Sequence, residues 1–137
     1  MTCGATTRRI KAQRKRDTMP AALYQHSRLT EEADGLWSRL ILRKAQDGRC
    51  KRCGEVRPLQ AAHNVSRRVS ATRHDPANGL PLCGGCHMLV DRDPDAKRGL
   101  FVQALGEAEY ERLRLAKLAG GKRDLALVIL DLRRLLG

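Results

Sequence analysis

Two Cys-x-x-Cys pairs constrain the middle of this 137-residue chain more than any other feature of its sequence. The pairs comprise Cys50, Cys53, Cys83 and Cys86. Together they can supply four thiolate ligands to one tetrahedral Zn²⁺ ion. The segment between residues 50 and 90 contains no Trp, Tyr or Phe, and so small a domain cannot bury a large core. Because zinc contributes on the order of 10–16 kcal/mol to the folding of small domains, the sequence predicts a structural zinc site.

The expected environment of these cysteines is a reducing cytoplasm. The longest apolar run covers residues 125–130, far fewer than the roughly 20 residues of a membrane span. The first twenty residues carry six Lys or Arg residues and no apolar segment typical of a secretory signal. In the cytoplasm, paired cysteines bind metal more often than they form disulfides. Cys3 belongs to neither pair, and we expect it to be a free thiol in a mobile terminus.

The charge of the chain indicates a polyanionic partner. Its net charge is +12, from 27 Lys and Arg against 15 Asp and Glu, and its pI is near 10.3. Residues 1–30 contain seven basic residues and one acidic residue, which account for half of the net charge. Such a segment suits non-specific contact with the phosphates of DNA. The alternative is a solvated, disordered tail without a specific partner.

The pattern of apolar residues predicts an α+β fold in three parts. Residues 1–29 are expected to form a basic, flexible arm. Residues 30–92 are expected to form the core, which begins with an amphipathic helix from Thr30 to about Gly48 that packs through Trp37. Residues 93–137 are expected to form a helical extension.

Within the core, the predicted order is a knuckle, a hairpin and a helix. We expect a metal knuckle at residues 50–54, a strand over 59–65, a basic loop over 66–78, an extended return over 79–82 and a helix over 83–90. In the extension, Asp93 and Pro94 predict the start of a helix that ends near Leu105. A second helix is expected over residues 107–119.

The last segment has one apolar face, made of Leu125, Val128, Ile129, Leu132, Leu135 and Leu136. We expect a helix that packs on its own domain through this face. Dimerisation through the same face is the alternative, although two heptads are fewer than a coiled coil requires. The predicted oligomeric state is therefore a monomer or a weak homodimer.

Three polar residues inside the cysteine frame are candidates for chemistry. His63, near the end of the predicted strand, could act as a general base, because imidazole titrates near neutral pH. Asn78 offers a hard oxygen to a divalent cation such as Mg²⁺, or it forms the turn that Asn-Gly sequences favour. His87 directly follows the last cysteine and could bind a catalytic metal or compete for the zinc.

The motifs that carry a family resemblance are Cys50-x2-Cys53, the strand ending in His63, the segment from Asp75 to Leu80 with Asn78, and Leu82-Cys83-x2-Cys86-His87. This pattern resembles the zinc-containing HNH endonucleases of the ββα-metal fold, especially the small phage-type ones. The resemblance covers residues 50–90. It implies that His63 is the general base, that Asn78 and His87 occupy the other two signature positions, and that the cysteines hold a structural zinc.

By the same resemblance, the expected reaction is metal-dependent hydrolysis of DNA with little sequence preference, with Mg²⁺, Mn²⁺ or another divalent cation as catalytic cofactor. Many family members carry a metal-binding Asp or His directly before the general base, where this chain has Ala62. Asp75 is the candidate replacement, and His74 is a further candidate. The basic loop is expected to contact DNA phosphates through Arg67, Arg68 and Arg73.

The alternative function is a non-catalytic zinc module that binds DNA or a protein partner. A third possibility is an accessory factor that acts only beside phage packaging or recombination proteins. If the chain is encoded by a phage, the expected location is the cytoplasm of the host cell.

Overall fold

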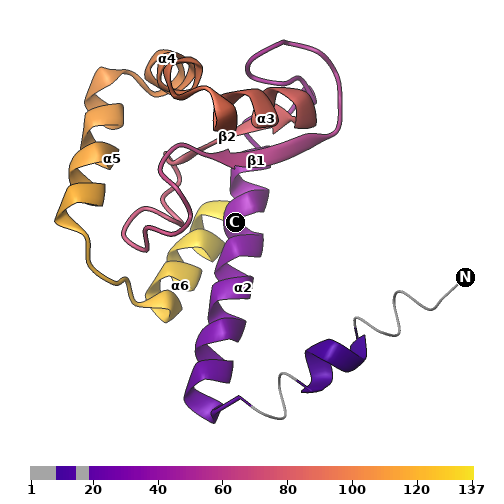
Figure 1. The fold of residues 1–137 in the computed structure, drawn as a ribbon, viewed down its shortest axis with the longest axis vertical. Helices are drawn as coiled ribbons and strands as arrows, with labels where there is room; N and C mark the ends of the chain where they lie inside the picture. Colours follow the sequence, from indigo (N-terminus) through magenta and orange to yellow (C-terminus); the bar gives the residue numbers. More distant parts are fainter. Residues whose placement is uncertain (1–8, 15–18) are drawn as a thin grey trace, which may run out of the picture.

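The computed structural model describes residues 9–14 and 19–137 and has an α+β fold (Figure 1). Residues 9–14 are helical. The elements that follow are α2 (Ala21–Leu42), β1 (Leu59–His63), β2 (Gly79–Cys83), α3 (Gly84–Arg92), α4 (Pro94–Leu105), α5 (Glu107–Ala119) and α6 (Leu125–Leu136). The predicted α+β class is confirmed. Cys3 lies outside the described residues, and within them no helix is long and apolar enough to cross a membrane.

Helix α2 starts earlier than the sequence suggested. It begins at Ala21 after Pro20, so the predicted start at Thr30 is wrong, and residues 21–29 of the expected flexible arm are helical. Thr30 lies inside the helix, where its Oγ1 donates a hydrogen bond to the His26 carbonyl at 2.9 Å. This is the usual bond of a threonine within a helix, rather than that of an N-cap. Residues 21–29 add nine positions to the predicted helix, because they include good helix formers such as Ala21, Ala22 and Leu23.

Strands β1 and β2 form a two-stranded antiparallel sheet in which His63 pairs with Gly79. The first strand ends at His63, two residues earlier than predicted. Every residue of β2 is buried, including Pro81, whose carbonyl accepts a hydrogen bond from the Lys51 amide at 3.1 Å. Gly79 is required by close packing, because a Cβ atom there would lie 2.5 Å from Cζ2 of Trp37.

Helix α3 follows β2 directly and packs against the hairpin (Figure 1). The hydrophobic cluster that joins them consists of Cys50, Ala62, Leu80, Leu82, Cys83, Cys86, Val90 and Phe101. Helix α4 starts as predicted, because the Asp93 side chain accepts hydrogen bonds from the Asp95 and Ala96 amides at 3.1 Å each. Helix α5 also has the predicted bounds, between Gly106 and Gly120.

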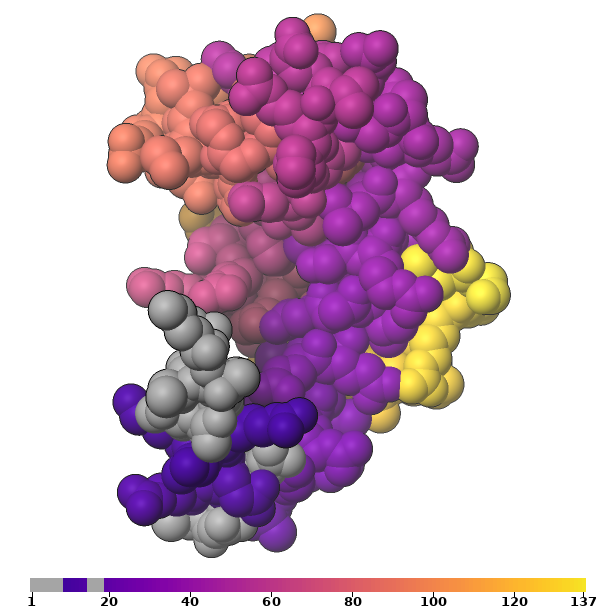
Figure 2. Space-filling view, turned by 90° about the vertical axis from the view of Figure 1, so that its right-hand side faces the viewer, coloured from indigo at the N-terminus to yellow at the C-terminus, as the bar shows by residue number. Residues whose placement is uncertain are grey.

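Helix α6 lies along the side of α2, as the yellow and purple surfaces in Figure 2 show. The residues that join the two helices in a second hydrophobic cluster are Ala33, Trp37, Ile41, Val128, Ile129 and Leu132. An ion pair between Glu32 and Arg133 links the same helices. The predicted packing of this helix on its own domain is confirmed. Leu135 is an exception, because it is exposed rather than on the buried face.

Candidate functional site

The four paired cysteines form a group that can hold one metal ion. Their Sγ atoms all lie within 4.8 Å of one another. The Sγ atoms of Cys53 and Cys83 are 3.9 Å apart. A tetrahedral zinc site with Zn–S bonds of about 2.3 Å requires a separation of about 3.8 Å between sulfur atoms. The residues therefore fit Zn²⁺, and the group joins the segment after α2 to the start of α3.

The environments of Cys50 and Cys86 shift the pKa values of their thiols in opposite directions. Burial acts to raise the pKa of Cys50, but hydrogen bonds from the backbone of Cys53, Cys83 and Arg52 outweigh it and lower that pKa to about 6. Burial raises the pKa of Cys86 to about 11. The Arg52 guanidinium lies 3.5 Å from the Cys86 sulfur and offsets part of this increase in pKa. A metal ion would hold all four as thiolates.

A second feature is a cavity of about 460 Å³ between α2, the hairpin, α3 and the start of α4. Its lining consists of Asp34, Trp37, Ser38, Ala61, His63, Ser66, Arg67, His87, Asp91 and Lys97. The structure thus brings His63 and His87, which are 24 positions apart in the sequence, to one solvent-accessible space. Arg67 and Lys97 place positive charge in the same lining.

His63 is held in one orientation by two contacts. Its ring stacks on the Trp37 indole, with ring centroids 3.9 Å apart and an interplanar angle of 13°. Its Nε2 lies 3.0 Å from the carbonyl oxygen of Arg73. A carbonyl oxygen can only accept, so Nε2 carries the hydrogen, and Nδ1 of the neutral ring keeps its lone pair. Burial lowers the pKa of His63, which favours this neutral form.

His87 faces a carboxylate on its own helix. Its Nδ1 is 2.7 Å from Oε1 of Gln60, an acceptor, so Nδ1 carries a hydrogen. Its Nε2 is 3.4 Å from Oδ2 of Asp91, four residues later on α3. In a neutral imidazole this Nε2 is itself an acceptor, so two acceptors face each other. Either a proton on Nε2 or a bound cation satisfies both atoms, and imidazole and carboxylate are both common metal ligands.

Asn78 lies in the protein interior, whereas its predicted role as a metal ligand requires a position at the cavity. It is fully buried, and it does not line the cavity. Its Oδ1 accepts a hydrogen bond from the Val65 amide at 2.7 Å, and its Nδ2 donates to the carbonyls of Val65 and Thr72 at 3.0 and 2.9 Å. Asn78 therefore closes the loop on itself, as the turn-forming alternative anticipated, and the geometry does not support it as a metal ligand.

Asp75 is likewise engaged elsewhere. Its two carboxylate oxygens accept hydrogen bonds from Arg112 of α5 at 2.9 and 3.1 Å, and Oδ1 also accepts from the Ala77 amide. It does not line the cavity, so its predicted role as a replacement metal ligand has no geometric support. Ala62 is fully buried in the core between the hairpin and α3 and offers no ligand atom.

The three loop arginines have separate environments. Arg67 and Arg68 are exposed, and Arg67 also lines the cavity. Arg73 instead forms a bidentate pair with Asp34 of α2, through Nε at 2.9 Å and Nη2 at 2.7 Å. Its guanidinium is thus directed to a carboxylate rather than to an external phosphate. His74 is buried, and its Nε2 lies 2.7 Å from the same carboxylate.

Sequence reasoning did not identify Asp34, Asp91 or Lys97. A signal for Asp91 was present, because a residue four positions after His87 lies on the same face of a helix. No local signal marks Asp34, which lies 29 positions before His63 and outside the motif-bearing segment. Lys97 is 3.5 Å from Asp91 and reaches the cavity from α4.

The chain matches no family model, no curated protein and no solved structure. What remains to indicate a function is the site itself. Its features are a four-thiolate group suited to zinc, and a cavity with an oriented neutral histidine, a histidine–carboxylate pair and two cationic side chains.

Proposed function

We propose that this protein is a metal-dependent HNH-type endonuclease that nicks or cuts double-stranded DNA with low sequence specificity. The observation that carries the proposal is the cavity that holds both His63 and His87, with His63 fixed so that Nδ1 keeps a lone pair. The four-cysteine group supports it as the structural element of the same domain. The proposal places the protein in a reducing cytoplasm, where the thiols stay available to zinc.

In this proposal, His63 is the general base. Its Nδ1 takes a proton from a water molecule as the water oxygen attacks the phosphorus. The bond from phosphorus to the 3′-oxygen breaks, and that oxygen takes up a proton from solvent water. The products carry a 5′-phosphate and a 3′-hydroxyl. A positioned base contributes about 10² to 10⁴ in rate. The neutral state that the base requires is favoured by the burial that lowers the pKa of His63.

His87 and Asp91 are the residues that we propose to hold the catalytic divalent cation. Nε2 of His87 and the Asp91 carboxylate already face each other across 3.4 Å, and Gln60 fixes the other ring nitrogen. When bound, the cation would supply stabilisation of the negative charge that develops on the phosphate oxygens. The cysteine-bound zinc is not this cation, because four thiolates complete its coordination.

The cationic side chains around the cavity are suited to the phosphates of DNA. Arg67 and Lys97 line the cavity, and Arg68, the next residue of the loop, is exposed. Contacts of this type position a duplex without reading its sequence. Arg73 is not among the residues that we propose to contact DNA, because its guanidinium pairs with Asp34.

Supercoiled plasmid provides the test. The purified protein, incubated with plasmid and Mg²⁺, Mn²⁺ or Ni²⁺ in turn, is expected to give nicked circles and then linear DNA, and added EDTA should stop the reaction. Product is measured on an agarose gel. Absence of product with all three metals would rule out a nuclease that acts alone.

The rival proposal is a non-catalytic zinc module, and one observation favours it. Among the residues that the structure describes, the cysteines are the only group that brings three or more His, Cys, Asp or Glu ligand atoms close together. This rival predicts stoichiometric zinc and DNA binding without cleavage in the same assay. Cleavage that appears only after a phage packaging or recombination protein is added would instead indicate an accessory factor.

The pH dependence of cleavage tests the role of His63. Burial lowers the pKa of His63 below its usual 6.5. As the pH falls, the ring therefore stays neutral, and able to accept a proton, to a lower pH than an ordinary histidine does. With saturating metal, kcat/KM is expected to fall on the acid side with a midpoint below pH 6.5. The measurement is initial cleavage rate between pH 4.5 and 8.5. A midpoint clearly above pH 6.5 would contradict His63 as the titrating base.

A further inference from the structure

The carboxylate of Asp34, on α2, anchors the loop that contacts His63 at two consecutive residues. Asp34 accepts two hydrogen bonds from the Arg73 guanidinium, at 2.9 and 2.7 Å, and its Oδ1 lies 2.7 Å from Nε2 of His74. Bidentate pairs of this kind are charge-assisted and geometrically specific. Asp34 therefore fixes two consecutive residues of an otherwise irregular segment.

The Arg73 residue that Asp34 holds is also the residue whose carbonyl contacts the general base. Nε2 of His63 donates to that carbonyl at 3.0 Å. A shift of Arg73 would move the acceptor, and the ring would lose the contact that selects the Nε2–H tautomer. The chain of contacts thus runs from Asp34 through Arg73 to His63.

Trp37, one turn after Asp34, completes the support from α2. Its indole Nε1 donates to the Asp75 carbonyl at 2.8 Å, and its ring stacks on His63. The stack restricts tilting of the imidazole, but it does not decide which nitrogen carries the hydrogen. That choice depends on the Arg73 carbonyl and hence on its anchor.

We propose that Asp34 is a positioning residue for His63: by holding Arg73, it fixes the tautomer and orientation of the imidazole. The catalytic consequence rests on the proposed function, whereas the effect on the His63 ring does not. Asp34 lies outside the segment of residues 50–90 that carries the sequence motifs. This role therefore belongs to α2, which the motifs do not include.

The test is the Asp34→Asn variant, which removes the charge and keeps the shape. The sample is protein with zinc bound to the four cysteines and no added divalent cation. Nitrogen-15 NMR of its imidazoles reports the tautomer of His63 without any cleavage assay. The Nε2–H form is expected to dominate in the parent, and an Nδ1–H population is expected to appear in the variant. With plasmid substrate, kcat should fall about 10- to 100-fold, because small misplacements of reacting groups have effects of this size, while KM for DNA stays unchanged.

The matched control is Glu32→Gln. Glu32 lies on the same helix and also pairs with an arginine, Arg133, and its side chain and that of Asp34 are both 40% exposed. It does not line the cavity. The control should keep the parental His63 spectrum and kcat, although it loses an ion pair between helices.

An unchanged Nε2–H signal in folded Asp34→Asn would overturn the proposal. If circular dichroism shows that this variant does not fold, Arg73→Lys provides the second test, because it keeps the backbone carbonyl and the charge but loses the bidentate pair. The same direction of change in the His63 spectrum is expected there, and an unchanged spectrum would again overturn the proposal. If the parent cleaves no DNA, the nuclease proposal fails, and the NMR comparison still decides the role of Asp34.

Discussion

Removal of zinc is expected to unfold the hairpin and α3. Cys50, Cys83 and Cys86 belong to the hydrophobic cluster of this region, so the metal site and the core are built from the same residues. Structural zinc contributes on the order of 10–16 kcal/mol in small domains, which is comparable to the roughly 5–15 kcal/mol of net stability of a whole domain. Far-UV circular dichroism and Trp37 fluorescence during titration with a strong chelator, with released zinc measured by a dye, check the expectation.

The variant that corresponds to this experiment is Cys83→Ser. It removes one ligand at the junction of β2 and α3 and should abolish stoichiometric zinc and cooperative thermal unfolding. Cys3→Ser is the matched control, because Cys3 belongs to neither Cys-x-x-Cys pair, and it should retain one zinc per chain. A Cys83→Ser protein with the parental zinc content and melting temperature would contradict a structural role for the four-cysteine group.

The second large effect is expected from His63→Ala. Loss of the proposed general base should lower the cleavage rate about 10²- to 10⁴-fold, while zinc content and DNA affinity stay at parental values. Trp37 loses the ring that stacks on it, and aromatic pairs of this kind contribute about 0.5–1.5 kcal/mol. A small decrease in melting temperature is therefore expected. Single-turnover cleavage of plasmid, alongside zinc analysis and a thermal melt, separates the chemical effect from the structural one.

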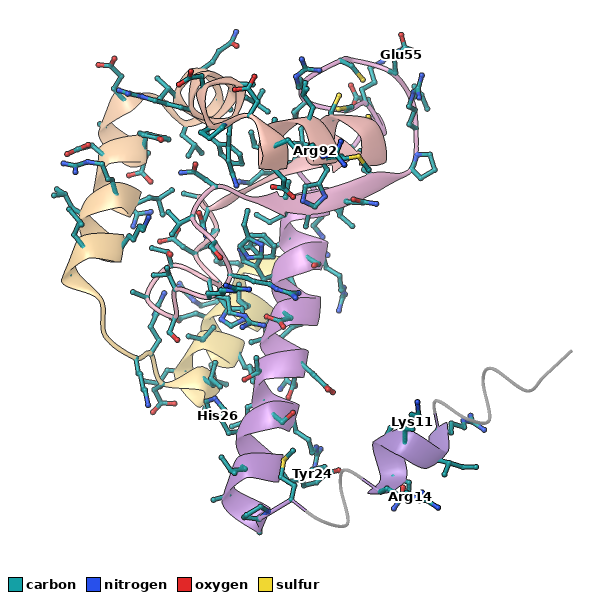
Figure 3. The ribbon with its side chains drawn as sticks, viewed as in Figure 1. Lys11, Arg14, Tyr24, His26, Glu55 and Arg92 are labelled. Carbon is teal, nitrogen blue, oxygen red and sulfur yellow. The ribbon has the colours of Figure 1, made fainter. Side chains whose placement is uncertain are left out.

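His26→Ala is the control for this variant. His26 is exposed near the start of α2, away from the hairpin (Figure 3), and it does not line the cavity. Its removal should leave the cleavage rate unchanged. Cleavage by His63→Ala at the parental rate would exclude His63 as the base, whatever the state of the metal site.

The parts of this fold that the sequence predicted correctly are those with local causes. Asp93 and Pro94 define the start of α4 through contacts within three residues, and Gly106 and Gly120 end the helices before them. The two Cys-x-x-Cys pairs predicted a common site because their spacing is a property of zinc coordination. His63 and His87 were identified as candidates because His63 lies between the two cysteine pairs and His87 directly follows Cys86.

The contacts that the sequence did not reveal are made with partners in other elements or elsewhere in the loop. Asn78 and Asp75 each have the chemistry of a metal ligand, but Asn78 binds the loop backbone, and Asp75 binds Arg112 from 37 positions away. Arg73 was expected to contact DNA, yet it is held by Asp34, 39 positions earlier. Local sequence patterns do not predict such pairings, because a carboxylate or a guanidinium can pair with many groups, and only the folded chain determines which of them lies nearby.

The absence of a side chain at Gly79 has a consequence for how the site could change. The indole of Trp37 occupies the space that a Cβ atom at position 79 would need, and the same indole supports His63. A single methyl group added there would press on Cζ2 and Cη2 of this indole, which supports the imidazole. The orientation of His63 is thus coupled to the steric fit between Gly79 and Trp37, so a change of shape that adds no charge offers a route to alter the site.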